Sequence, residues 1–90
     1  MYSVDFTTQF SKDVKKCVKR GLDIKLLYDV IELLKQSGKL PQQYHPHILH
    51  GNYEGIWECH IKGDWLLLWK QNDNTLTLLM TNTGTHSDLF

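Results

Sequence analysis

The chain has 90 residues, of which 41% are hydrophobic and 22% charged, and its formal net charge is zero. This length predicts a single domain over residues 1–90, because chains usually divide only well beyond about 200 residues. The longest apolar run has five residues, from Trp65 to Trp69, which excludes a membrane-spanning helix. Two cysteines, Cys17 and Cys59, and a start that lacks a secretory signal predict a small cytoplasmic protein without a disulfide framework.

The zero net charge hides an uneven distribution. Residues 1–44 contain eight Lys and Arg against five acids, whereas residues 45–90 contain two lysines against five acids. Overall neutrality argues against strong nonspecific attraction to nucleic acid. The histidines all lie in the second part, so its surface should respond to pH between about 5 and 7. They are His45, His47, His50, His60 and His86.

The first half of the chain predicts a short strand followed by two helices. Apolar residues alternate with polar ones at the N-terminus, which is typical of a strand. Thr7 or Thr8 can cap a helix that ends at Gly21. Asp23 can cap a second helix that ends at Gly38. The apolar positions of the two helices are Phe10, Val14, Cys17 and Val18, then Ile24, Leu27, Ile31 and Leu34.

The second half predicts three strands, over residues 55–61, 64–70 and 75–81. Lys62-Gly63 is expected to form the first turn, and residues 72–74 the second. The order strand, helix, helix and three hairpin-linked strands predicts an α+β domain. We expect a small, mainly antiparallel β-sheet with the two-helix hairpin packed on one face. Leu76, Leu78 and Met80 are expected to share one face of the last strand.

Hairpin pairing would bring several histidines and one carboxylate to one edge of this sheet. His60 and Asp64 flank the first turn, His47 and His50 precede the three strands, and His86 follows them. Imidazoles titrate near neutral pH, so they can donate and accept protons in one reaction cycle. Cleavage of RNA through the ribose 2′-hydroxyl needs such a base and such an acid, and it needs no metal ion.

The same residues also allow plainer interpretations. A histidine at a strand end is usually solvated or hydrogen-bonded, and Asp64 fits an ordinary turn. Trp65 and Trp69 fit the core, and the basic helix face fits a solvent-exposed surface. The sequence lacks a Cys-x-x-Cys pair and a His-Glu-x-x-His helix, so we expect no metal site and no small-molecule cofactor.

Three motifs resemble the YafQ branch of the RelE/ParE toxin superfamily, and the similarity extends over the whole chain. They are Tyr44-x-x-His47-x-Leu49-x-Gly51, Glu58-Cys59-His60-Ile61-x-x-Asp64-Trp65-Leu66-Leu67 and Thr83-Gly84-Thr85-His86-Ser87-Asp88-Leu89-Phe90. The resemblance implies a RelE-like β-α-α-β-β-β fold. It also implies a bacterial type II toxin that enters the ribosomal A site and cuts the mRNA codon there, until a cognate antitoxin neutralises it.

By position, the resemblance implies a catalytic set of His47, His60, Asp64 and His86, with His86 the first choice for general acid or base. His45 and His50 have no counterpart and are expected to be surface residues. The residues expected to support the site or to contact the substrate and the ribosome are Trp65, Asn82, Phe90, Lys15, Lys16, Lys19 and Arg20.

Two departures from the family pattern concern the phosphate. Asn82 and Trp57 stand where relatives often carry Arg. Arg can hold a phosphate through two hydrogen bonds, whereas Asn offers only a neutral amide. Lys62, Lys70 or a protonated histidine would have to replace that charge. The departures therefore support a second hypothesis, a weakly active or inactive toxin-fold module that binds its antitoxin and takes part in operon repression.

Overall fold

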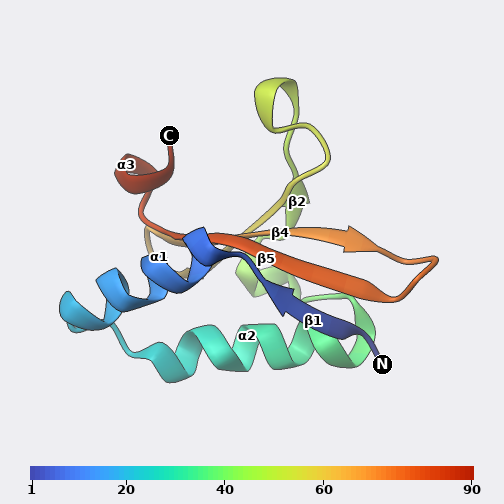
Figure 1. Cartoon of the computed structure of the whole chain (residues 1–90), viewed down its shortest axis with the longest axis horizontal. Coiled ribbons are helices and arrows are strands. Elements are labelled where there is room, and N and C mark those ends of the chain that lie inside the picture. The colour runs from blue at the N-terminus through green and yellow to red at the C-terminus, as the bar shows by residue number, and fades with distance from the viewer.

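The computed structural model describes residues 1–90, and it forms a five-stranded sheet with two long helices on one face (Figure 1). The strand order is β1-β5-β4-β3-β2; β1 runs parallel to β5, and the other pairs are antiparallel. The predicted α+β class is therefore confirmed. The strands are β1 (Ser3–Phe6), β2 (His47–Ile48), β3 (Trp57–Lys62), β4 (Trp65–Asn72) and β5 (Thr77–Gly84). The helices are α1 (Thr8–Lys19), α2 (Ile24–Ser37) and α3 (His86–Leu89), with 3-10 turns at Gln42–Tyr44 and Gly51–Tyr53.

The two long helices begin and end where the sequence predicts. The Thr7 hydroxyl accepts a hydrogen bond from the Phe10 N–H and caps α1, and Asp23 caps α2 through the Lys25 N–H. Gly38 ends α2 with a φ of 70°. A side chain at this position would lie 2.6 Å from the Tyr2 ring, so glycine is required for both its conformation and its size.

The hydrophobic core lies between the helices and the sheet face that they cover. Val18 was expected in the apolar stripe of α1, but it is exposed, because only one face of this helix reaches the sheet. The core residues on the helices are Phe10, Cys17, Leu27, Val30, Ile31 and Leu34, and those on the strands are Cys59, Ile61, Trp65, Leu67, Trp69, Leu78 and Met80. None of the helices is long and apolar enough to cross a membrane.

The strand boundaries differ from the predicted ones at two turns. Lys62 pairs with Trp65, so the first turn is Gly63–Asp64 and lies one residue later than expected. The last strand begins at Thr77, and Leu76 lies in the preceding turn with a φ of 55°, so it is exposed and does not share a face with Leu78. Both β2 and α3 were missed, because two and four residues are too short to show a period.

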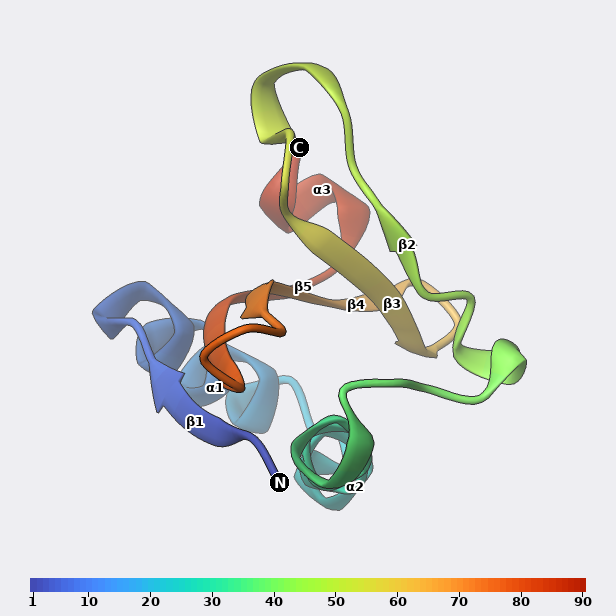
Figure 2. The same cartoon turned by 90° about the vertical axis from the view of Figure 1, so that its right-hand side faces the viewer.

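The sheet face opposite α1 and α2, here called the open face, carries two rows of aligned residues. His47 pairs with Glu58, which pairs with Leu68, which pairs with Asn82. In the next row His60 pairs with Leu66, which pairs with Gly84. Paired residues point to the same side of a sheet. Figure 2 shows α3 and the arm formed by residues 49–56 on this side of the sheet, away from the two long helices.

Adjacent leucines on α2 provide a test of this arrangement. Leu34 is 1% exposed in the core, whereas Leu33 is 38% exposed. We expect Leu34→Ala to lower the free energy of unfolding by about 2–5 kcal/mol, because it leaves a cavity, and Leu33→Ala to lower it by less than about 1 kcal/mol. Urea denaturation followed by circular dichroism measures both. Equal losses would contradict the assignment of the buried face of α2.

Candidate active site

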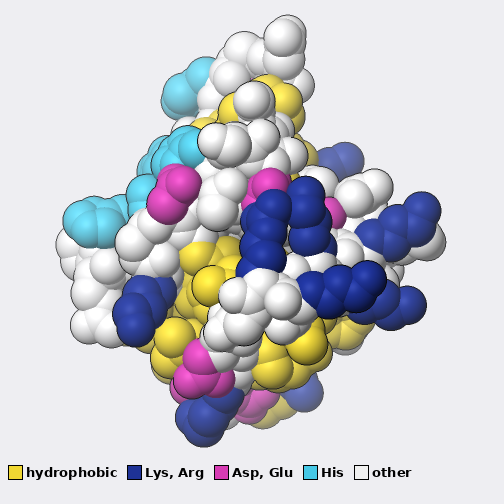
Figure 3. All heavy atoms as spheres, turned by 90° about the vertical axis from the view of Figure 1, so that its left-hand side faces the viewer, with side chains coloured by type: hydrophobic (Ala, Val, Ile, Leu, Met, Phe, Trp, Pro, Cys, Tyr) yellow, Lys and Arg dark blue, Asp and Glu magenta, His cyan; other side chains and the backbone are white.

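Histidines from distant parts of the chain meet on the open face. The ring centroid of His60, on β3, lies 6.0 Å from that of His86 on α3 and 5.8 Å from that of His45. His45 was expected to be an uninvolved surface residue, yet its ring packs edge-on against His60. His50 is exposed on the arm, as expected. Figure 3 shows histidine side chains gathered on one part of the surface that carries α3.

His86 is held by Asp64 from the β3–β4 turn. Its Nδ1 donates a hydrogen bond to Asp64 Oδ1, and its backbone N–H approaches the same oxygen at 3.4 Å. This contact with Asp64 raises the pKa of His86 above its ordinary value of 6.5, with a smaller contribution from the charge of Glu58. In return, His86 lowers the pKa of Asp64 below its ordinary 3.8. The pair therefore favours a protonated imidazole at His86.

His60 is held by a different kind of partner. Its Nδ1 lies 3.0 Å from the Gly63 carbonyl oxygen. Because a carbonyl can only accept, the proton of this hydrogen bond belongs to Nδ1. The neutral ring then carries its lone pair on Nε2, where it can accept a proton. The two neighbouring imidazoles therefore differ in the group that holds Nδ1, which is a carbonyl for His60 and a carboxylate for His86.

His47 and Glu58 form a third part of the site. His47 Nδ1 donates to the His45 carbonyl at 2.9 Å, and His47 Nε2 lies 3.2 Å from Glu58 Oε1. The Glu58 side chain is only 6% exposed. Both ring nitrogens of His47 therefore face oxygen atoms that can accept a hydrogen bond. Glu58 was not among the predicted site residues. Its position two residues before His60, on the same face of the strand, could have indicated it.

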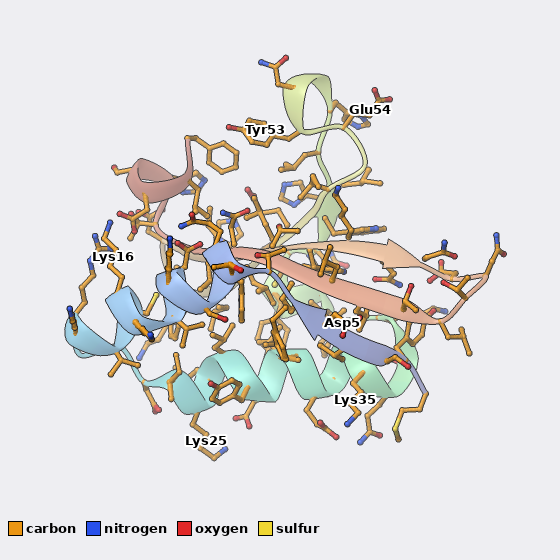
Figure 4. All side chains as sticks on the ribbon, viewed as in Figure 1. Asp5, Lys16, Lys25, Lys35, Tyr53 and Glu54 are labelled. Atoms are coloured by element: carbon orange, nitrogen blue, oxygen red, sulfur yellow. The ribbon has the colours of Figure 1, made fainter.

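The C-terminus closes one side of the site with aromatic rings. Phe90 packs edge-on against Tyr53 of the arm, with ring centroids 4.9 Å apart, and lies 6.1 Å from His86. Figure 4 shows Tyr53 on the arm, next to the C-terminal end of the chain. Phe90 is exposed, so its ring offers a surface that a nucleobase could stack on. Tyr53 was missed, because nothing in its sequence context separates it from an ordinary loop residue.

Trp65 lies beneath the site rather than in it. It is only 4% exposed and packs in the core, so it offers little surface to a substrate. Its Nε1 donates to Thr83 Oγ1 at 2.9 Å, and the same hydroxyl donates to the Leu66 carbonyl at 2.7 Å. Trp65 thus fixes the end of β5 three residues before His86.

The two positions that lack Arg differ in importance. Trp57 stacks on Trp69 at 6.0 Å on the helix-covered face, so the expectation that it removes a cation from the site is wrong. Asn82 lies in the same row as Glu58, but its side-chain amide donates to Asp13 at 3.4 Å. Asp13 also accepts from the Thr83 N–H at 3.1 Å.

Two lysines were expected to replace the positive charge that Asn82 lacks, and neither lines a hollow together with a histidine. Lys62 lines a hollow beside the α1–α2 connection with Asp23 and Trp65, away from the histidines. Lys70 lines a hollow of about 640 Å³ further along the open face, together with Glu54 of the arm and Asp5. No three His, Cys, Asp or Glu side chains converge as a metal site would require.

The expected basic patch on α1 is divided. Lys16 and Arg20 both form ion pairs with Asp88 of α3, whereas Lys15 and Lys19 are exposed and form none. Figure 3 shows the Lys and Arg side chains gathered beside the histidine surface, with acidic side chains among them. Contact of these four residues with the substrate and the ribosome stays a prediction, and Lys16 and Arg20 have a partner within the protein.

Fold and site together define a class of protein: an α+β domain whose open sheet face carries a cluster of histidines and carboxylates. Comparison with known proteins identifies the family. Residues 2–90 match the family described as a bacterial toxin of type II toxin-antitoxin systems, YafQ. The chain belongs to this family.

Individual relatives agree over nearly the whole chain. The mRNA interferase toxin YafQ of Escherichia coli K12 is 38% identical over 88 residues, which cover 97% of this chain and 94% of the relative. The YafQ structure in the E. coli DinJ-YafQ toxin-antitoxin complex has a TM-score of 0.88 at 36% identity and covers 99% of this chain and 97% of that one. A metal-bound toxin from Helicobacter pylori has a TM-score of 0.89 at 38% identity, with both chains fully covered.

The His86–Asp64 pair should make stability depend on pH. The raised pKa of His86 means that its contribution is complete below about 6.5 and is lost as pH rises through the folded value. The lowered pKa of Asp64 means that its contribution is complete above 3.8 and is lost as pH falls through the folded value. We therefore expect Asp64→Asn to destabilise the protein most between about pH 4 and 6.5.

Urea denaturation of wild type and Asp64→Asn at pH 5 and pH 9 measures this dependence. The difference between the two proteins should be larger at pH 5. An equal or larger difference at pH 9 would contradict the charged pair.

Proposed function

We propose that this protein is a toxin of a bacterial type II toxin–antitoxin pair and acts as a ribosome-dependent mRNA endoribonuclease that cuts at the A-site codon. The observation that carries this proposal is the pair of His60 and His86, whose ring centroids lie 6.0 Å apart and whose Nδ1 atoms bond to a carbonyl and to a carboxylate, respectively. The YafQ family and the mRNA interferase named among its members support the same conclusion.

Each histidine has one step in the proposed reaction. His60 Nε2 accepts the proton of the ribose 2′-hydroxyl, and the 2′ oxygen attacks the neighbouring phosphorus. As the bond from phosphorus to the 5′ oxygen breaks, His86 Nε2 donates its proton to that oxygen. The products are a 2′,3′-cyclic phosphate and a 5′-hydroxyl. Asp64 orients His86 and stabilises its protonated form, as a carboxylate does in a catalytic triad.

The pentavalent phosphorus carries extra negative charge, which a cation must stabilise. We assign this role to His47, which lies in the row of residues next to that of His60 and contacts the buried Glu58 carboxylate. Acid, base and cation are then all side chains, so we propose that the reaction needs no metal ion or other cofactor. We expect that toxin treated with a chelator, and then assayed on intact ribosomes in magnesium buffer, cuts mRNA as fast as untreated toxin.

RNA would lie across the open face. Phe90 and Tyr53 offer rings for base stacking, and Lys70 offers a cation to a flanking phosphate. Lys15 and Lys19 on α1 would attract the ribosome, and this contribution should weaken as salt rises. Asn82 can offer an amide to the phosphate only if it leaves Asp13.

The proposed partners are the ribosome with its mRNA and a cognate antitoxin. The E. coli relative forms a complex with the antitoxin DinJ, and we extend this kind of pairing to the present chain. The proposed site of action is the cytoplasm, where mRNA is translated. A second candidate function, an antitoxin-binding module with little cleavage, is favoured by the neutral Asn82, whose amide is occupied by Asp13.

Expression in a bacterium without antitoxin tests the proposal. We expect wild type to arrest growth and primer extension on translated mRNA to detect cuts inside codons. His86→Ala should abolish both, because general acid catalysis contributes about 10²–10⁴-fold. His50→Ala is the matched control, since it removes an exposed histidine outside the cluster.

Arrest in wild type and His50→Ala but not in His86→Ala would support the nuclease. Intact transcripts and continued growth at confirmed expression, together with tight binding of an antitoxin, would favour the binding module instead.

A further inference from the structure

The helix that carries His86 is too short to be stable alone. α3 has four residues, whereas isolated helices shorter than about 12 residues are marginal in water. Local hydrogen bonds stabilise its first turn: Asp88 Oδ2 accepts from the Thr85 N–H at 2.9 Å, and Thr85 Oγ1 accepts from the Asp88 N–H at 3.3 Å. This capping box shapes α3, but it does not fix the helix relative to the rest of the protein.

Ion pairs connect α3 to α1. Arg20 Nη1 lies 2.5 Å from Asp88 Oδ2, and Arg20 Nη2 lies 2.9 Å from Asp88 Oδ1. Lys16 Nζ donates to Asp88 Oδ1 at 3.3 Å, and Figure 4 shows Lys16 pointing from α1 toward α3. The hydrogen bonds from Arg20 hold the pKa of Asp88 well below its usual range. A two-point Arg–carboxylate pair is among the stronger and more directional contacts available to side chains.

The surroundings of Asp88 are tight as well as charged. Its side chain is only 15% exposed, although it belongs to a short surface helix. A Cβ on Gly84 would lie 2.9 Å from Asp88 Oδ2, so the end of β5 passes directly beside the carboxylate. Asp64, the other residue that holds α3, has a side chain that is 58% exposed and comes from a turn. Of the two carboxylates, Asp88 is therefore the more buried and the more firmly held.

We propose that Arg20 is a positioning residue: together with Lys16 it binds Asp88, and this contact fixes α3 so that the His86 ring faces Asp64 and His60. The proposal rests on the proposed nuclease function for its effect on activity, but not for its structural effect. It gives Arg20 a role inside the protein in place of contact with RNA.

Two substitutions remove this contact while leaving other features intact. Arg20→Gln removes the guanidinium. Asp88→Asn keeps an oxygen for the Thr85 N–H, so the capping box survives while the charge is lost. Lys12→Gln is the control, because it removes an exposed positive charge from the same helix at a residue that forms no ion pair with Asp88.

The first measurement is cleavage of ribosome-bound mRNA at varied substrate concentration. We expect Arg20→Gln and Asp88→Asn to lower kcat about 10- to 100-fold, since a catalytic group displaced by about 1 Å loses rate on this scale. KM should stay near the wild-type value, and Lys12→Gln should resemble wild type. A raised KM with unchanged kcat in Arg20→Gln, or an equal loss in Lys12→Gln, would assign Arg20 to RNA attraction and overturn the proposal.

The second measurement is an NMR titration of His86 in the isolated full-length proteins, which does not depend on cleavage. The pKa of His86 should fall toward its ordinary value in Arg20→Gln and in Asp88→Asn. In the protein that carries both substitutions, the pKa of His86 should be no lower than in the single variants. Unchanged titration in both variants would overturn the proposal. If Arg20→Gln does not fold, Arg20→Lys, which keeps the charge but loses the two-point contact, should show a smaller fall. A shifted titration in a protein that cuts no RNA would leave the positioning role standing and remove the nuclease function.

Discussion

The structure depends on the fact that α1 and α2 cover only one face of the sheet. Side chains alternate along each strand, so burial of Cys59, Leu67 and Trp69 under the helices directs Glu58, His60 and Leu66 to the opposite face. A shift of one residue in the pairing would exchange these two sets and bury the histidine. The packing that buries the core therefore also places Glu58 and His60 on the open face.

Two histidines on the open face have different hydrogen-bond partners. His60 and His86 have the same intrinsic chemistry, but one donates to a carbonyl and the other to a carboxylate. The carbonyl fixes a tautomer with an available lone pair, and the carboxylate stabilises the charged ring. In the proposed reaction, the first ring accepts the proton of the 2′-hydroxyl and the second donates a proton to the leaving oxygen.

The sequence allowed prediction of those parts that depend on local chemistry. Thr7, Asp23 and Gly38 set the helix ends through contacts within a few residues, and all three positions are confirmed. The first β-turn lies one residue later than expected because of an irregularity between His60 and Lys62, which no local pattern announces. This shift places Asp64 in the turn itself, where it meets His86.

Contacts between distant segments account for what the sequence did not indicate. Arg20 and Asp88 are 68 positions apart, and each has an ordinary local interpretation, a basic helix end and a capping residue. Glu58 and Tyr53 likewise acquire their significance only when the sheet and the arm are assembled. The contact between His45 and His60 also joins segments that are separate in the sequence.

The central claim is that His86 acts as the acid and His60 as the base. It is tested most directly by cleavage of ribosome-bound mRNA in which sulfur replaces the bridging 5′ oxygen at the cut site. A sulfur leaving group departs without protonation, so the substrate should restore cleavage to His86→Ala and should not restore it to His60→Ala. Restoration of His60→Ala alone, or of neither variant, would contradict the assignment.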